Sequence, residues 1–434
     1  MLVEFKVANF RSIRSEQVFT MAAESGRNKS DNTFSLTLAD GSEERLLRSA
    51  VIYGANASGK STFILAFLVF RYFVSESSKF KVDKPINCYE PFLLDVDFEN
   101  APVEFEITFI NKEKIKYRYG IKFNRNYVLY EQLDFYPNGK ITNLFKRSSE
   151  SEDYDTLSLG KSLKDKNISR KVFKNQLYLS RFGFSEPHDQ LTPIYRYLNE
   201  LNIWNASNKI RLDSLRKDIS KLILEPNNQI FAKKLSKLIK VADTKIENVS
   251  VKVALENEFE FPDFLPEDLK KQFIEDNSIK AFATHTLYKE KNEIGIRELP
   301  FDEESQGTNV LFALGGLILQ TLDKGGVIIV DELDNSLHPK LSKFLVRLFN
   351  SPITNKWNAQ LIFASHEVTL LDKDNLRKDQ IWFTSKDKFG ETELFSAKDF
   401  EGVRDDTPFD KWYNSGKFGG DPKIKEVEFI FGND

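Results

Sequence analysis

The chain has little cysteine and no long apolar run, and each shortage excludes a class of protein. Cys88 is the only cysteine among 434 residues, which excludes an internal disulfide and a cysteine-rich zinc site. The longest apolar stretch, residues 310–322, is too short to span a bilayer and contains Gly315, Gly316 and Gln320. We therefore expect a soluble protein of a reducing, cytoplasmic compartment, with no membrane partner.

A strong charge of either sign is missing as well. Lysine and arginine number 62 against 65 aspartate and glutamate, so a protein that coats nucleic acid is not indicated, although a local basic patch stays open. Residues 1–6 lack a basic region followed by an apolar run, and we expect no signal peptide. Hydrophobic residues make up 41%, enough for a sizeable core.

The hydrophobic pattern changes along the chain and predicts a mixed α/β protein. Residues 49–53 form an apolar strand, and residues 62–72 form a helix without a breaker. Residues 103–135 alternate with period two, which predicts an antiparallel meander with one buried face. Beyond residue 307, strands at 327–330 and 361–364 alternate with helices, which is typical of a parallel sheet with crossovers.

The middle of the chain is the least informative part. Residues 148–170 are rich in Ser, Lys and Asp and predict an exposed loop. Leu212, Leu215, Ile219 and Leu222 have heptad-like spacing, but Pro226 ends the run. We therefore predict a compact, mainly helical insertion and no long coiled-coil arms.

A glycine loop between the first apolar strand and its helix carries the strongest chemical signal. Two glycines let the backbone fold tightly around phosphates, a lysine places a cation at the β- and γ-phosphates, and a serine hydroxyl is a magnesium ligand. The residues that we expect to bind ATP here are Gly54, Asn56, Ala57, Ser58, Gly59, Lys60, Ser61 and Thr62, with Ser61 also on Mg²⁺.

Polar residues follow two later apolar strands, at the edge where open α/β sheets bind ligands. Asp331 would hold Mg²⁺, and Glu332 would polarise the water that attacks the γ-phosphate. His366, after the next strand, would hydrogen-bond the γ-phosphate and sense its presence. An acidic turn and a structural histidine are the plainer alternatives.

Small residues at 304–308 stand directly before the helix that contains residue 310. A glycine and hydroxyl residues at a helix N-terminus make an anion site. An ordinary N-cap formed by Ser305 or Thr308 explains the same residues.

These four motifs, in this order, resemble the ATPase of the ABC and SMC-like superfamily, with Walker A, signature, Walker B, D-loop and switch histidine. The resemblance implies an ABC-type P-loop head with an antiparallel β subdomain. It also implies that two heads sandwich two nucleotides in a homodimer or higher oligomer, and that Ser305 and Gly307 act across the dimer. Glu332 and His366 would then be catalytic.

Further segments narrow the resemblance to the bacterial AAA family ATPases related to OLD nucleases and RecF-like proteins. Members occur in abortive-infection and other anti-phage operons, often beside a separate nuclease or toxin gene. The likeness covers both lobes but not the insertion. The family pattern implies that Arg11 contacts the nucleotide, and a surface arginine beside a strand is the alternative. The segments that carry it are residues 9–12, 90–95, 331–339, 379–383 and 413–419.

The sequence also departs from the transporter pattern. The signature contains Ser305, Gln306, Gly307 and Thr308, and His338 stands where transporters have the D-loop aspartate. No clear Q-loop glutamine follows the glycine loop. We expect four parts: an N-terminal ATPase lobe at 1–147, the loop and insertion at 148–300, a C-terminal lobe at 301–395, and a tail at 396–434.

Three functions compete on these grounds. The first is a slow, regulated ATPase that controls a partner effector in anti-phage defence. The second is an SMC- or RecF-like ATPase that binds DNA in repair or tethering, for which lysine pairs such as Lys233–Lys234 and Lys270–Lys271 are candidates against a solvated helix face. The third is a nuclease, which we expect least, because an OLD-type nuclease needs a Toprim-like domain after the ATPase and only 68 residues follow His366.

Overall fold

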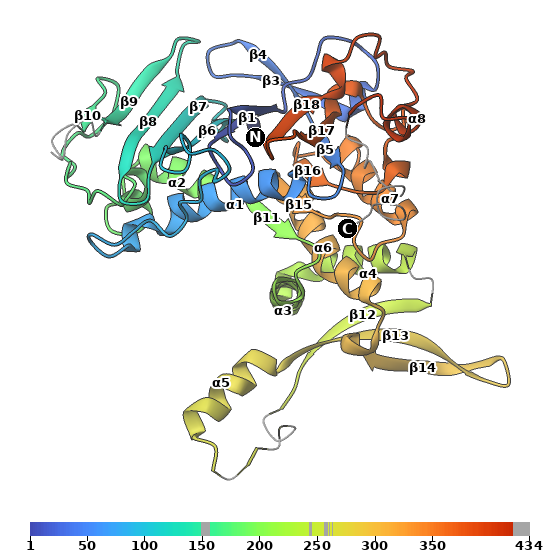
Figure 1. Ribbon diagram of the computed structural model, residues 1–434. Helices are drawn as coiled ribbons and strands as arrows, with labels where there is room; N and C mark the ends of the chain where they lie inside the picture. The colour runs from blue at the N-terminus through green and yellow to red at the C-terminus, as the bar shows by residue number, and fades with distance from the viewer. Residues whose placement is uncertain (149–156, 243–244, 256–258, 260, 263, 420–434) are drawn as a thin grey trace, which may run out of the picture. The chain divides into compact units, whose positions relative to one another are not determined.

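The computed structural model describes every residue except 149–156, 243–244, 256–258, 260, 263 and 420–434 (Figure 1). The chain divides into two compact units. Unit 1 contains Met1–Ile203, Gly325–Asp331 and Val346–Asp434, and unit 2 contains Trp204–Lys324 and Glu332–Leu345. The four-part division expected from the sequence stays a prediction, and its loop at 149–156 and the end of its tail lie outside the described residues.

A six-stranded sheet carries the glycine loop. Its strand order is β11-β15-β16-β5-β17-β18, in which β15, β16, β5 and β17 are parallel and β18 is antiparallel to β17. Because β15, β16 and β5 are buried along their whole length, their near-continuous apolar runs are those of a strand covered on both faces. The strands are β5 (Ser49–Gly54), β11 (Asn202–Asn205), β15 (Val327–Asp331), β16 (Gln360–Ala364), β17 (Ile381–Lys386) and β18 (Thr392–Ser396).

A seven-stranded antiparallel sheet forms the other layer of unit 1, in the order β10-β9-β8-β7-β6-β1-β2. The predicted meander is confirmed, since β6, β7 and β8 pair in sequence. The strands are β1 (Leu2–Ala8), β2 (Gln17–Thr20), β6 (Val103–Ile110), β7 (Lys116–Phe123), β8 (Val128–Tyr136), β9 (Thr142–Ser148) and β10 (Ser158–Leu159). A separate hairpin contains β3 (Thr33–Thr37) and β4 (Glu43–Leu47).

Helix α1 (Lys60–Glu76) contacts strands of the parallel sheet and packs against the antiparallel sheet through phenylalanines. The ring of Phe5 on β1 stacks on Phe67 with centroids 3.8 Å apart and meets Phe63 and Phe70 edge-on. All four rings are fully buried. Figure 1 shows α1 running along the antiparallel sheet toward α2 (Leu191–Asn199). Stacked phenylalanine rings therefore form the contact between α1 and β1.

Unit 2 packs three helices closely. Helices α3 (Lys209–Leu224) and α4 (Gln229–Ala242) lie against α6 (Gln306–Lys324). A Cβ at Gly315 would stand 2.7 Å from Leu238, and one at Gly316 would stand 2.8 Å from Ile219. Both glycines therefore allow α6 to approach its neighbours more closely than any larger residue would.

The insertion also contains a sheet that its sequence did not reveal. Strands β12 (Ile246–Val253), β13 (Ile279–Lys289) and β14 (Asn292–Pro300) pair antiparallel in that order. Helix α5 (Glu267–Asn277) lies between β12 and β13 in sequence. Much of β13 and β14 is partly or fully exposed, so the strands lack the alternation by which a half-buried strand is detected.

Two further helices, α7 (Pro339–Asn350) and α8 (Phe409–Asn414), complete the regular structure. Within the described part of the chain, no helix is long and apolar enough to span a membrane. Cys88 is buried, and burial raises the pKa of its thiol to about 12, so the side chain stays protonated at neutral pH.

Candidate nucleotide-binding site

The glycine loop joins the end of β5 to the start of α1, and its two glycines cannot carry side chains. A Cβ at Gly54 would stand 2.5 Å from the carbonyl oxygen of Thr384. Gly59 caps α1 with φ of 113°, and a Cβ there would stand 2.9 Å from that of Thr392. Asn56 and Ala57 at the crest of the loop are exposed. The loop thus has the tight backbone that brings amide groups to a phosphate.

Lys60 is buried, and its ammonium group lies inside the loop. Its Nζ donates to the carbonyl oxygens of Gly54 at 2.6 Å and Ala55 at 3.0 Å. Ser61, the next residue, is exposed. The lysine charge is therefore held at the position where the loop would receive phosphate oxygens.

Two threonines from distant strands support the loop from behind. Thr384 on β17 places its Oγ1 2.6 Å from Ser58 Oγ. Thr392 on β18 donates from Oγ1 to the carbonyl oxygen of Ser58 at 3.0 Å. Sequence reasoning missed both residues, because they lie more than 320 positions from the loop and no local motif marks them.

Asp331 and His366 lie at the same edge of the sheet as the glycine loop. Strand β16 is parallel to β15 on one side and to β5 on the other, so the carboxyl ends of all three strands share one edge. Asp331 ends β15 and is buried, whereas His366 lies two residues after β16 and is exposed. The structure thereby brings the predicted metal ligand and the predicted γ-phosphate sensor of unit 1 to one edge.

Glu332 begins the part of unit 2 that follows this strand. Its φ is 56°, and Ser336 in the same turn has φ of 62°. A left-handed backbone is uncommon outside glycine and is concentrated at functional sites, where surrounding structure maintains the strain. Glu332 is partly exposed, and its carbonyl oxygen accepts from the amide of Asn335 at 2.9 Å.

Ser305 and Gly307 lie at the exposed start of α6 in unit 2. The Oγ of Ser305 accepts from the amide of Thr308 at 3.1 Å, which is the N-cap arrangement. A Cβ at Gly307 would stand 2.6 Å from the carbonyl oxygen of Ser336, so this turn approaches α6 directly. Ser305 therefore caps the exposed N-terminus of α6.

The donor set suits magnesium. Ser61 supplies a hydroxyl and Asp331 a carboxylate, both hard oxygen donors. Across the described residues, no cluster of three or more His, Cys, Asp or Glu could hold a metal by itself. A cation bound by few protein oxygens, with phosphates and water completing its shell, is the usual form of a Mg²⁺-nucleotide site.

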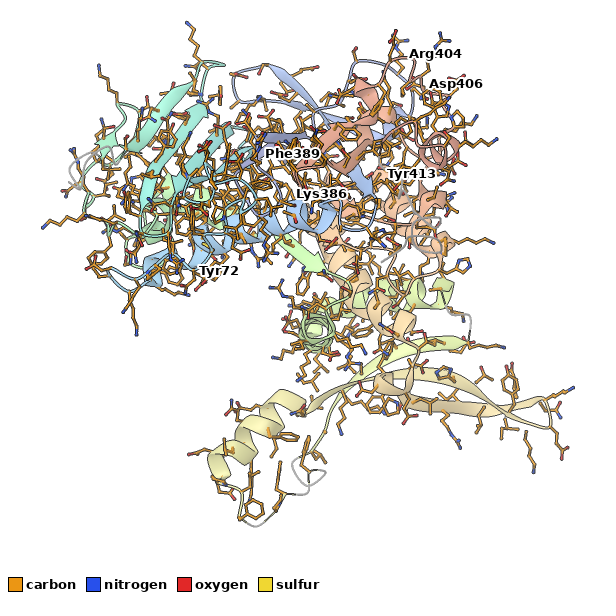
Figure 2. The ribbon with its side chains drawn as sticks, in the orientation of Figure 1. Tyr72, Lys386, Phe389, Arg404, Asp406 and Tyr413 are labelled. Atoms are coloured by element: carbon orange, nitrogen blue, oxygen red, sulfur yellow. The ribbon has the colours of Figure 1, made fainter. Side chains whose placement is uncertain are left out.

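Arg11 lies beside a cavity of about 810 Å³ in unit 1. Its φ is 51°, its amide donates to the carbonyl oxygen of Glu90 at 2.8 Å, and its guanidinium pairs with the carboxylate of Glu90. Lys386, labelled in Figure 2, lines the same cavity at the end of β17. Ser12 in the cavity wall contacts Thr62 of α1 at 3.3 Å, so the cavity adjoins the helix that follows the glycine loop.

A family model described as "AAA domain, putative AbiEii toxin, Type IV TA system" matches residues 49–372. That range contains the glycine loop, the start of α6, Asp331, Glu332 and His366. A comparison with curated proteins finds no match.

Several solved structures are similar at low identity. The SMC head domain from Thermotoga maritima is 13% identical, with 91% of this chain and 98% of that chain covered and a TM-score of 0.38. An Smc head from Pyrococcus furiosus, bound to the C-terminal domain of ScpA, is 15% identical, with 91% and 96% covered and a TM-score of 0.40. The recombination mediator protein RecF is 12% identical, with 91% and 98% covered and a TM-score of 0.38.

Substitution of Gly54 tests the loop geometry. We expect Gly54→Ala to weaken ATP binding by at least about tenfold, the factor given by 1.4 kcal/mol, because the new Cβ forces the loop away from Thr384. Gly402→Ala is the matched control, since Gly402 also has positive φ and no described atom would lie within 4 Å of a Cβ added there. Calorimetry on both variants, with melting curves, separates lost binding from lost folding; wild-type affinity in Gly54→Ala would refute the loop assignment.

Proposed function

Because the chain belongs to the AAA domain family described for the AbiEii toxin of type IV toxin–antitoxin systems, we propose that it hydrolyses ATP to control a partner effector in anti-phage defence. The family match covers residues 49–372, and the parallel sheet with its glycine loop, beside an antiparallel sheet, is the α/β architecture that the sequence led us to expect. The proposal goes beyond the family match in three respects: ATP hydrolysis, dimerisation around nucleotide and control of an effector.

One observation carries the ATPase proposal. The buried ammonium of Lys60 lies in a loop at one edge of the sheet. Asp331, at the end of β15, and His366, just after β16, lie at the same edge. A cation inside a loop of amides, with a carboxylate and an imidazole on adjacent strands, is complementary to a triphosphate with its metal. A purely structural loop gives no reason to bury a lysine charge beside two backbone carbonyls.

Each residue then has a role in the proposed reaction. Lys60 and the loop amides hold the β- and γ-phosphates, and Ser61 and Asp331 would hold Mg²⁺, which neutralises developing phosphate charge. Glu332 orients the attacking water and accepts its proton. His366 donates a hydrogen bond to the γ-phosphate and so distinguishes ATP from ADP.

A head dimer is proposed from the start of α6. Ser305 is exposed at the N-terminus of the 19-residue helix α6, where the helix dipole favours an anion, so a phosphate held by a second copy could bind there. This arrangement places Ser305 and Gly307 of one copy on the nucleotide of the other. The exposed His338 would lie in the same interface, in place of the aspartate of transporters.

The cavity beside Arg11 is the proposed place for the nucleoside end of ATP. It adjoins α1 through Ser12, and its size accommodates a base and ribose. Arg11 would exchange its carboxylate partner Glu90 for the nucleotide. This exchange turns a surface ion pair into a nucleotide contact.

DNA binding in repair or tethering remains the second candidate function. The lysines that favoured it are partly neutralised, since Lys234 pairs with Asp323 at 2.6 Å and Lys270 with Glu267 at 2.8 Å. Exposed pairs of this kind are typical of solvated helix faces. Control of an effector is therefore the function that we favour over DNA binding.

Calorimetry on Lys60→Ala tests nucleotide binding. We expect wild-type protein with Mg²⁺ to bind ATP, and Lys60→Ala to lose at least about tenfold in affinity, because the charge at the β- and γ-phosphates is gone. Lys79→Ala, an exposed lysine paired with Glu76, is the control and should bind normally. Wild-type protein that gives no heat with millimolar ATP or a slow analogue would end the ATPase proposal.

Glu332→Gln tests the hydrolytic step. The amide cannot accept the proton, so turnover should fall by about 10²- to 10⁴-fold while ATP binding persists. Light scattering should then detect an ATP-dependent dimer that wild-type protein forms only transiently. Glu303→Gln, an exposed acid at the start of the same unit's α6 region, should leave turnover unchanged; unchanged turnover in Glu332→Gln removes that residue from its role.

Co-expression with the neighbouring genes separates the two functions. An effector regulator should co-purify with a neighbouring product and show ATPase activity that duplex DNA does not alter. A DNA-tethering ATPase should be stimulated by duplex DNA, with binding that weakens steeply as salt rises. DNA stimulation without any co-purified product would replace the defence proposal with the second function.

A further inference from the structure

The C-terminal segment 409–419, which we name the brace, packs its aromatic rings on the nucleotide-binding sheet of unit 1. Tyr413 stacks on Phe383 of β17 with centroids 5.7 Å apart, and Phe418 stacks on the same ring at 4.5 Å. Tyr413, labelled in Figure 2, also contacts the ring of Tyr53 at 5.8 Å. The brace therefore touches the residue that directly precedes Gly54.

Tyr53 connects the glycine-loop strand to the turn that carries His366. Its ring is fully buried, and its hydroxyl donates to the carbonyl oxygen of Glu367 at 3.0 Å. On the other side of His366, the amide of Ser365 donates to the carbonyl oxygen of Ile52 at 3.2 Å. The backbone is thus fixed on both sides of an exposed histidine, with a further bond from the amide of Glu367 to Ser365 Oγ at 3.0 Å, and the bond from Tyr53 depends on a side-chain hydroxyl.

The brace reaches the same turn by a second route. Helix α8 contacts the short 3₁₀ helix η8 (Val368–Leu370), which begins two residues after His366. Glu367 caps η8 by accepting from the amide of Thr369 at 2.9 Å. Movement of α8 would therefore act on the segment 366–370 directly, as well as through Tyr413 and Tyr53.

We propose that Tyr53 is a positioning residue for His366, and that the brace keeps Tyr53 and η8 in place so that hydrolysis responds to the state of the C-terminal segment. The inference rests on the proposed ATPase function. A γ-phosphate sensor stabilises charge only while its donor is held in position, and a displaced turn loses that preorganisation. A partner that displaced the brace would slow hydrolysis without touching the nucleotide.

Tyr53→Phe removes the hydroxyl and keeps the ring. We expect kcat to fall about three- to tenfold, the effect of one hydrogen bond, with the affinity for ADP within about twofold of wild type. The preference for a slow ATP analogue over ADP should fall in parallel, and amide exchange in residues 365–371 should speed up. In a His366→Ala background the same change should have no further effect on kcat, because the residue that it positions is gone.

A variant at Tyr413 tests the brace. Tyr413→Ala removes the ring contacts with Phe383 and Tyr53 and should reproduce the Tyr53→Phe phenotype. Tyr178→Phe is the matched control, because it removes a hydroxyl that also donates from a buried ring to a carbonyl oxygen, that of Ser169, at 3.1 Å. It should change neither the nucleotide preference nor exchange at 365–371.

The outcomes separate this inference from the ATPase proposal. Wild-type protein that binds no ATP ends both. Wild-type protein that binds ATP, with a Tyr53→Phe variant of unchanged kcat, preference and exchange, overturns the positioning role alone. An additive loss in the His366→Ala background also overturns it, since Tyr53 would then act through general stability.

Discussion

The candidate site depends on the parallel pairing of β15, β16 and β5. That register aligns the carboxyl ends of three strands, from which the glycine loop, the buried Asp331 and the turn of His366 all continue. Segments separated by about 280 to 310 residues in sequence become neighbours through backbone pairing and the burial of their apolar side chains. A slip of one residue would exchange the side chains of the two buried faces and disrupt the close packing on each.

The same sheet explains why the loop is supported from the far end of the chain. Strand β17 pairs with β5 on the side away from β16, and β18 closes the edge, so Thr384 and Thr392 meet Ser58 from behind. The brace then covers Phe383 of β17. The loop conformation therefore depends on strands from the whole unit. Glycine is needed at positions 54 and 59 because Thr384 and Thr392 lie so close to the loop.

Much of this architecture was predictable from local patterns. Local sequence alone indicated the buried strands β5, β15 and β16, the helix α1 and the alternating strands β6 to β8. The fold class and the family were predicted correctly. Thr384 and Thr392 were not predictable, because their importance arises from contacts across the sheet. The sheet β12–β14 escaped detection because its strands are largely exposed, and the strained φ of Glu332 has no sequence signature outside glycine. The roles of the site residues stay predictions.

The two glycines of α6 have a consequence for packing. Because Gly315 lies against Leu238 and Gly316 against Ile219, α6 lies against α4 and α3 at a spacing that a larger side chain at either position would prevent. Strands β12 and β13 also contact α3, and β12 contacts α4, so the three-stranded sheet packs on the same helices. A larger side chain at Gly315 or Gly316 would therefore disturb the packing of this sheet as well as the contact between the helices.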